Sequence, residues 1–161
     1  MAEEVDLQAG PGGSLLITSA IRPYVAFDNP ERLRRTTMPL NTVLIEDSET
    51  IRENLIPTLA ELADAHVIAV AQTASEAMEA LDRHKHEWDL AVVDLFLKEG
   101  SSGLSVLRAA RDRSPRQHMV VLTNYPTIEI RRRCLELGAD GVFDKSTELE
   151  AFFDLCSSYG A

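Results

Sequence analysis

Residues 88–94 read Trp-Asp-Leu-Ala-Val-Val-Asp, a short apolar run that ends in the carboxylate of Asp94. Four consecutive apolar residues between two aspartates are typical of a strand that is buried on both faces of a sheet. Comparable apolar runs occur before and after this one, and each is followed by a stretch whose apolar residues recur at helical spacing. This alternation predicts β-α units that build a parallel sheet with helices on both faces.

Five such units are expected between residues 41 and 161, with strands at residues 42–45, 65–71, 88–93, 119–122 and 141–143. Local signals mark the helices between them. Thr73 and Glu76 are spaced as a capping box at the start of one helix, and Gly138 suits the left-handed end of another. Pro57 predicts a kink or an irregular turn in the first helix, because proline removes a backbone hydrogen bond.

Composition restricts the function classes. The chain has 161 residues with 26 acidic and 16 basic side chains, and residues 41–161 alone carry 21 acidic and 12 basic ones. This acidic balance argues against nucleic acid as the main partner. No apolar run approaches the roughly 20 residues of a membrane span, and the acidic start lacks the pattern of a signal peptide. Cys134 and Cys156 occupy apolar helix positions and are expected to be reduced core residues, as is usual in the cytoplasm.

Residues 1–40 do not continue the β-α pattern. Gly10, Pro11, Gly12 and Gly13 resemble a linker, and residues 15–27 could form a strand or stay loose. We expect residues 1–40 to be a flexible extension and residues 41–161 to form the folded domain. A sharper hypothesis is that translation starts at Met38, just before the first strand.

Polar side chains follow four of the five expected strands. Glu46 and Asp47 follow the first, Asp94 the third, Thr123 the fourth and Lys145 the fifth. Since the carboxyl ends of parallel strands share one rim, these side chains should meet there. Each has an ordinary structural explanation alone, such as a helix N-terminal acid, a cap or an exposed lysine. Five of them at four strand ends favour a functional site.

Three carboxylates at one rim repel each other unless a cation joins them, and ligand sets made only of oxygen select hard ions such as Mg²⁺. With the metal bound, one carboxylate can act as a nucleophile toward phosphorus. Catalysis of that transfer consists mainly of alignment and of neutralising charge on the phosphoryl oxygens. The side chains of Thr123 and Lys145 are suited to contact those oxygens.

From about residue 40 to residue 159 the chain resembles the receiver domain of bacterial two-component response regulators. The acidic pair Glu46-Asp47, then Asp94, Thr123 and Lys145, the last within Gly-Ala-Asp-Gly-Val-Phe-Asp-Lys, stand at the family's functional positions. The resemblance implies an α/β, doubly wound, flavodoxin-like sheet of five parallel strands in the order 2-1-3-4-5.

The resemblance also implies roles for these residues. Asp94 would be the phosphoacceptor, with Thr123 and Lys145 assisting it. Mg²⁺ would be held by Asp47, Asp94 and the backbone carbonyl of Phe96, with Glu46 acting through water. The protein would accept a phosphoryl group from a phosphohistidine on a histidine kinase or a histidine phosphotransfer protein, and would then alter a surface that binds a downstream effector protein.

Several further expectations follow from the resemblance. The protein would act as a stand-alone switch, as a monomer or weak dimer, and would be no enzyme apart from catalysing its own phosphorylation and dephosphorylation. One alternative is a binding module that never receives phosphate. Another is an aspartyl-phosphate phosphohydrolase of the haloacid dehalogenase type, but Phe96 stands where that class needs an acid. Nucleotide binding is a third alternative, although neither a P-loop nor GxGxxG follows the first strand.

The chain departs from the usual family pattern at several positions. Lys98 and Ser146 replace common prolines, and the interval between residues 94 and 103 is one residue longer than usual, which predicts a differently shaped loop. Val142 stands where an aromatic switch residue is common, so Tyr125 is the candidate substitute. The three arginines at 131–133 are interpreted as a solvated face rather than as a docking patch, which is the alternative.

Two further groups of residues are assigned to ordinary structural roles. His84 and His86 face apart on a helix and are interpreted as solvated surface rather than as metal ligands. Trp88 is expected to lie in the core.

Overall fold

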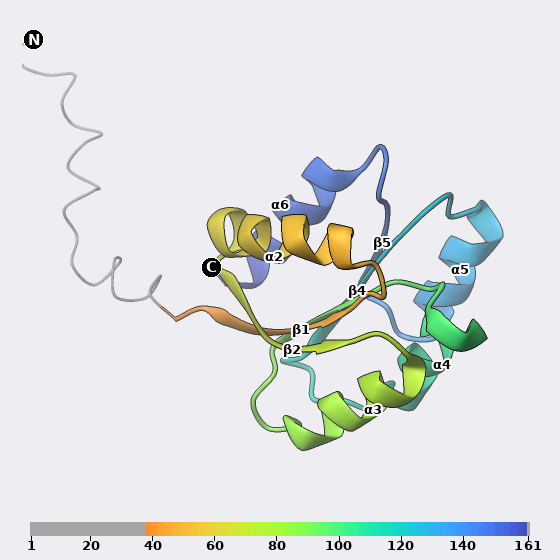
Figure 1. The fold of residues 1–161 in the computed structure, drawn as a ribbon, viewed down its shortest axis with the longest axis horizontal. Helices are drawn as coiled ribbons and strands as arrows, with labels where there is room; N and C mark the ends of the chain where they lie inside the picture. The colour runs from red at the N-terminus through yellow and green to blue at the C-terminus, as the bar shows by residue number, and fades with distance from the viewer. Residues whose placement is uncertain (1–37, 161) are drawn as a thin grey trace, which may run out of the picture. The chain divides into compact units, whose positions relative to one another are not determined.

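The computed structural model describes residues 38–160, so the expectations for the linker and the extension lie outside the described residues. Five parallel strands form one sheet in the order β2-β1-β3-β4-β5, as the sequence predicted (Figure 1). The strands are β1 (Leu40–Ile45), β2 (Ala65–Ala71), β3 (Leu90–Val93), β4 (His118–Thr123) and β5 (Gly141–Asp144).

Helices cover both faces of this sheet. The described α-helices are α2 (Glu49–Ala63), α3 (Ala74–Arg83), α4 (Gly103–Ala109), α5 (Ile128–Glu136) and α6 (Leu149–Tyr159), and a short 3-10 turn, η2 (Lys98–Gly100), precedes α4. Buried residues of α2 and α6 belong to one core cluster, and those of α3, α4 and α5 belong to the other. Figure 1 shows α2 and α6 on one side of the sheet and α3 on the opposite side. None of the described helices is long and apolar enough to cross a membrane.

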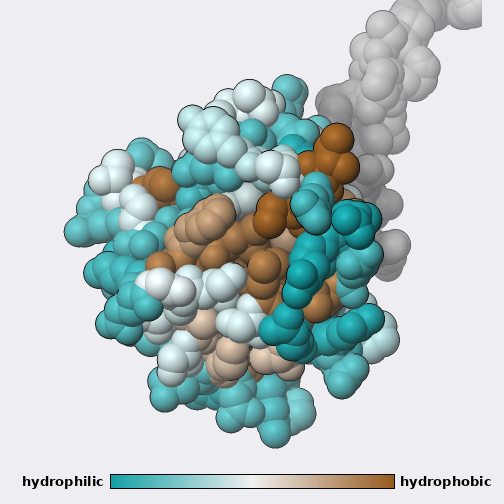
Figure 2. Space-filling model, turned by 90° about the vertical axis from the view of Figure 1, so that its right-hand side faces the viewer, coloured by the Kyte–Doolittle hydropathy of each residue, from teal (hydrophilic) through white to brown (hydrophobic). Residues whose placement is uncertain are grey.

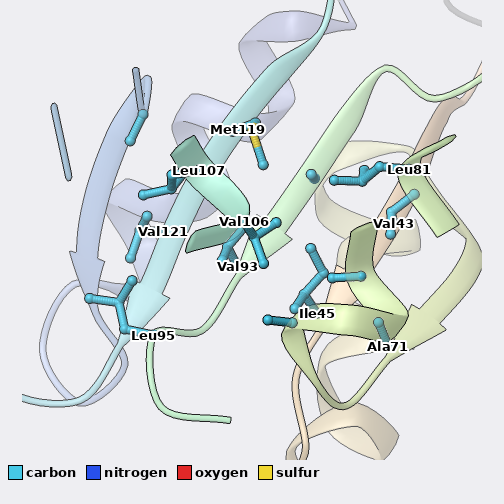
Figure 3. Close-up of a cluster of buried hydrophobic side chains, with 14 of the residues drawn as sticks. Val43, Ile45, Ala71, Leu81, Val93, Leu95, Val106, Leu107, Met119 and Val121 are labelled. Atoms are coloured by element: carbon cyan, nitrogen blue, oxygen red, sulfur yellow. The ribbon is translucent and has the colours of Figure 1, made fainter. Parts of the chain in front are cut away.

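Alternating strand residues divide the core into these two clusters. Val43 and Ile45 of β1 face one cluster, whereas Leu44 between them faces the other, because successive side chains of a strand point to opposite faces. Figure 3 shows the first cluster, where strand side chains meet α3 and α4; the labelled residues include Val43, Ile45, Leu81, Val93, Val106, Leu107 and Val121. Burying each such side chain contributes about 1.5–3 kcal/mol to folding.

Local signals in the sequence are mostly confirmed, with three differences. The Thr73 hydroxyl accepts from the Glu76 amide, but the Glu76 carboxylate accepts from the Gln72 amide, so the reciprocal half of the capping box is displaced by one residue. Helix α2 continues through Pro57 from Glu49 to Ala63, so the expected irregularity does not divide it. Strand β3 begins at Leu90 and not at Trp88, although Trp88 is buried in the core as predicted.

The junction between β3 and α4 leaves no room for a side chain at Gly103. The Gly103 amide donates to the carbonyl of Leu95 at 3.0 Å, which holds the start of α4 against the chain segment after β3. A Cβ at this position would overlap the carbonyl oxygen of Asp94 and lie 2.8 Å from a methyl group of Val93. The first turn of α4 therefore fixes the backbone of Asp94.

We predict that Gly103→Ala lowers the free energy of unfolding by about 1–3 kcal/mol, because the new methyl group forces backbone atoms apart. Chemical denaturation measures this change. Gly160→Ala is the matched control, since a Cβ there meets only ordinary contacts at 3.8 Å or more, and its effect should stay within about 0.5 kcal/mol. Equal stability of the two variants would contradict the close packing at Gly103.

Candidate functional site

The polar residues that follow the strands meet at one rim. In Figure 1, β1 runs from left to right, so the carboxyl ends of the parallel strands lie on the right-hand side. The Lys145 ammonium lies 2.7 Å from Oε1 of Glu46 and 3.0 Å from Oδ2 of Asp94. The Thr123 hydroxyl donates to Oδ1 of Asp94 at 3.0 Å. Carboxylate oxygens of Glu46, Asp47 and Asp94 all lie within 4.8 Å of one another. The five residues selected from the sequence are thus brought together.

Backbone hydrogen bonds extend the sheet ladder to these residues. The Glu46 amide donates to Ala71 of β2 at 2.9 Å, and the Asp94 amide donates to Ile45 of β1 at 2.9 Å. The Lys145 amide donates to Thr123 of β4, again at 2.9 Å. Glu46, Asp94 and Lys145 therefore start from backbone positions that the neighbouring strands fix.

Burial makes the electrostatics of this site strong. Glu46 is 3% exposed and Asp94 6% exposed, and the Lys145 side chain is 10% exposed. Burial raises the pKa of Glu46 above its ordinary value, and the hydrogen bond from Lys145 offsets only part of that effect. Burial alone would lower the pKa of Lys145, but the hydrogen bond to Glu46 and the charges of Asp94 and Glu46 outweigh it and raise the pKa. Lys145 therefore stays protonated between the two buried carboxylates.

The donor set fits a hard divalent cation. When Glu46, Asp47 and Asp94 are ionised, one ammonium balances only one of three negative charges, and the oxygen ligands are of the kind that Mg²⁺ and Ca²⁺ prefer. In the described part of the chain, these residues form the only group of three or more potential ligands from histidine, cysteine and acidic side chains. His84 instead contacts Glu87, in agreement with its interpretation as a surface residue.

Phe96 follows Asp94 by two residues. Its amide lies 3.5 Å from Oδ1 of Asp94, and its backbone pairs with Ser102 across the loop before α4. The Phe96 side chain is largely exposed. The loop carries two consecutive left-handed residues, Glu99 with φ 61° and Gly100 with φ 69°.

Two residues that the sequence reasoning missed hold Glu46 in place. The Ser48 amide donates to Oε2 of Glu46 at 3.1 Å, and the Ser48 hydroxyl caps α2 by accepting from the amide of Ile51. The Arg52 guanidinium donates to the carbonyl of Glu46 at 2.9 Å. Serine as a cap before a helix is a recognisable signal, whereas no sequence pattern identifies the contact of Arg52.

The interpretation of residues 131–133 as a solvated face is wrong for Arg131. Its guanidinium donates to the carbonyl of Val142 at 3.0 Å and to Oε1 of Glu148 at 2.9 Å. The Glu148 oxygen also accepts from the amide of Asp144 at 2.9 Å. Arg131 therefore joins α5 to β5 and to the start of α6. The neighbouring Arg132 is 63% exposed, as expected of a solvated residue.

The two candidate switch residues have opposite environments. Val142 is buried in the cluster beneath α5, and the adjacent Phe143 packs against the other cluster, as the alternation of strand side chains requires. The side chain of Tyr125 is largely exposed.

Figure 2 shows the side of the molecule to which the strand ends point. An apolar area lies in its middle, and hydrophilic side chains surround it. A charged group placed among apolar neighbours is screened less by water, so interactions at this rim act at a lower effective dielectric constant than on an open surface.

Comparisons with known proteins agree with this geometry. The family described as the response regulator receiver domain matches residues 42–156. A solved response regulator from Burkholderia pseudomallei, with a phosphorylated aspartic acid, a calcium ion and citrate, is 25% identical with a TM-score of 0.63; the match covers 75% of this chain and 68% of that one. The receiver domain of a response regulator from Geobacillus stearothermophilus is 26% identical with a TM-score of 0.63, over 76% of this chain and 94% of that one.

The chain belongs to the family of response regulator receiver domains. A cyclic di-GMP phosphodiesterase from Thermotoga maritima is 31% identical over 109 residues, which are 68% of this chain and 28% of that protein. The chain spans little more than a quarter of that relative's length.

We predict that millimolar Mg²⁺ stabilises the wild-type protein, because a ligand that binds only the folded state adds about 1.4 kcal/mol at ten times its Kd. Asp47→Asn should lose most of this stabilisation by Mg²⁺. Without metal, the variant should unfold at the same temperature as wild type or at a higher one, because one repulsive charge is removed. Thermal unfolding with Mg²⁺ or a chelator measures both effects. Asp112→Asn, at an exposed position, is the control and should respond like wild type. A full response of Asp47→Asn to Mg²⁺ would exclude its carboxylate as a ligand.

Proposed function

We propose that this protein is a phosphoacceptor switch of a two-component phosphorelay and that Asp94 accepts the phosphoryl group. The observation that carries the proposal is the placement of one buried carboxylate between a hydroxyl and an ammonium. Thr123 contacts Oδ1 of Asp94 and Lys145 contacts Oδ2, each at 3.0 Å. Membership of the receiver family supports it, as does the solved relative from Burkholderia pseudomallei with its phosphorylated aspartic acid.

The proposed reaction moves a phosphoryl group from nitrogen to oxygen. A carboxylate oxygen of Asp94 attacks the phosphorus of a phosphohistidine, a new phosphorus–oxygen bond forms, and the phosphorus–nitrogen bond breaks. The electron pair of that bond stays on the imidazole nitrogen of the donor. Lys145 and Thr123 then donate to phosphoryl oxygens in place of the carboxylate oxygens that they contact in the free protein.

Glu46, Asp47, Asp94 and the carbonyl of Phe96 are the proposed metal site, and the acidic cluster supports that assignment. A bound Mg²⁺ would supply positive charge to the oxygens of the transferred group. Arg52 and Ser48 orient the Glu46 main chain and side chain, respectively. Hydrolysis of the resulting acyl phosphate uses the same groups, so the protein would catalyse its own dephosphorylation.

The donor must reach the rim while contacting the protein surface beside it. A groove of about 360 Å³ lies between α2 and α6, next to Lys145. Its apolar lining includes Ile51, Leu55, Leu149 and Phe153. We propose this groove as the docking site of a histidine kinase or a histidine phosphotransfer protein, with its histidine directed toward Asp94. The α5, β5 and α6 side would then serve the downstream effector.

A cytoplasmic location is part of this proposal, supported by two buried cysteines that form no disulfide.

The two rival functions are weaker on specific grounds. A phosphohydrolase of the haloacid dehalogenase type needs a general acid two residues after the nucleophile, and Phe96 has no acidic group. A binding module without phosphorylation would not need Thr123 and Lys145 arranged around Asp94, and both are largely buried there.

We predict that the purified protein gains one phosphoryl group from acetyl phosphate in the presence of Mg²⁺, because its own side chains perform the transfer. Intact mass spectrometry should detect the added mass in wild type and in Asp112→Asn, but not in Asp94→Asn. Chelation of the metal should abolish labelling in every case. Equal labelling of Asp94→Asn, or labelling that survives the chelator, would refute the proposal.

A further inference from the structure

The backbone of Phe96 is turned toward the acidic site. Phe96 pairs with Ser102 across the loop between β3 and α4, but the hydrogen bonds of this pair come from the amides of Leu97 and Gly103 and are accepted by other carbonyls of the loop. In such a pair, the carbonyls of the two facing residues point away from each other. The Phe96 amide points toward Oδ1 of Asp94, and the carbonyl of an extended residue lies on the same edge as its amide. The Phe96 carbonyl is therefore directed to the side of the loop on which the acidic cluster lies.

The tip of this loop cannot hold that carbonyl in place by itself. It passes through two left-handed residues, Glu99 and Gly100, and both are exposed. The left-handed conformation costs an ordinary residue such as Glu99 a factor of about ten in population. A strained, exposed loop tip opens easily unless contacts from other elements restrain it.

Two hydrogen bonds tie the loop to the turn that precedes α3. The Lys98 amide donates to the carbonyl of Gln72 at 3.2 Å, and the Ser101 hydroxyl accepts from the amide of Ala74 at 3.0 Å. The Ser101 hydroxyl also donates to the carbonyl of Lys98 at 2.9 Å. Phe96 lies between β3 and the first of these ties, so both ends of its short segment are fixed.

Both ties depend on residues that depart from the usual family pattern. Lys98 stands at the place of a common proline, and proline has no amide hydrogen to donate. Ser101 lies in the interval between residues 94 and 103, which is one residue longer than usual. The different loop that the sequence predicts is therefore also a loop with its own attachment to α3.

The Ser101 hydroxyl has a simpler use that a test must separate from this one. The Ala74 amide belongs to the first turn of α3, where backbone donors lack partners within the helix. The Thr73 hydroxyl, which caps this helix, accepts from the amide of Glu76 instead. Satisfying the Ala74 amide stabilises the fold whether or not a metal is bound.

We propose that Ser101 is a positioning residue for the metal site and that, together with the Lys98 amide, it keeps the Phe96 carbonyl within reach of a divalent cation held by the acidic cluster. This inference rests on the proposed function, which assigns that carbonyl to the metal site. Ser101 itself contacts neither the metal nor the transferred group. Loss of a tie leaves the carboxylates in place and releases the carbonyl, so the affinity for metal falls while the fold persists.

The test measures the Kd of Mg²⁺ by isothermal titration calorimetry and, separately, the free energy of unfolding in a chelator by chemical denaturation. Ser101→Ala should raise the Kd about threefold to tenfold, as expected for one hydrogen bond that supports a metal ligand. Ser101→Thr keeps the hydroxyl and should bind Mg²⁺ nearly as wild type does. Lys98→Pro removes the amide hydrogen and should also raise the Kd severalfold; the extended backbone of Leu97 accepts a following proline.

Two variants serve as matched controls and should keep the wild-type Kd. Lys98→Ala removes the same exposed side chain as Lys98→Pro but keeps the amide hydrogen. Ser158→Ala removes an exposed hydroxyl that donates to the carbonyl of Leu155 near the end of α6, away from the loop.

The two measurements distinguish the possible outcomes. If wild type binds Mg²⁺ and Ser101→Ala binds it with the same Kd, the hydroxyl only satisfies the Ala74 amide; the inference is then overturned and the proposed function stands, even if the variant is less stable. Equal Kd values for Lys98→Pro and Lys98→Ala would also overturn it, because the carbonyl would then need no tie to Gln72. Absence of Mg²⁺ binding by wild type would remove the proposed metal site, and this inference with it.

Discussion

The contact of one lysine with two buried carboxylates is the constraint on which the rest of the structure depends. Glu46 follows β1 and Lys145 follows β5, and β3 and β4 lie between those strands. With neighbouring strands about 4.8 Å apart, the two backbones are separated by about three strand spacings. Only long side chains can close that distance, and the ammonium reaches Glu46 at 2.7 Å by passing over β4. On β4 itself the side chain must be short, and Thr123 fills that place. The sheet order and the choice of side chains at the rim therefore depend on each other.

This arrangement concentrates unfavourable negative charge in a buried part of the protein. Buried carboxylates destabilise a folded chain unless they are paired, and one lysine cannot pair with three of them. A hard cation would offset that cost, because such ions bind where several negative oxygens have been collected. The Ser48 amide reduces the cost in part, since it donates to the carboxylate of Glu46. The charges of Glu46 and Asp94 keep Lys145 protonated in spite of its burial and hold its ammonium against both carboxylates.

Much of the fold and of the candidate site could be predicted from sequence, because both depend on the order of residues along the chain. The five apolar runs gave the strands, parallel pairing placed their ends on one rim, and the residues after each run then had to meet. Contacts made by long side chains follow no such periodicity. Arg131 belongs to a run of three arginines that looks uniform, yet it alone reaches Val142 and Glu148. The positive φ of Tyr125 could not be predicted from sequence either, because an aromatic residue before proline predicts extended backbone. The displaced capping contact of Glu76 depends on a rotamer choice between two adjacent amides.

The contact between Arg131 and Glu148 links α5 to the residues beside the site at the strand ends. Glu148 connects Arg131 to the amide of Asp144, the residue before Lys145, so a short chain of hydrogen bonds joins α5 to the backbone beside Lys145. Coupling between two sites is reciprocal in free energy. Any contact that displaces Arg131 on α5 would therefore also disturb the hydrogen bonds next to Lys145.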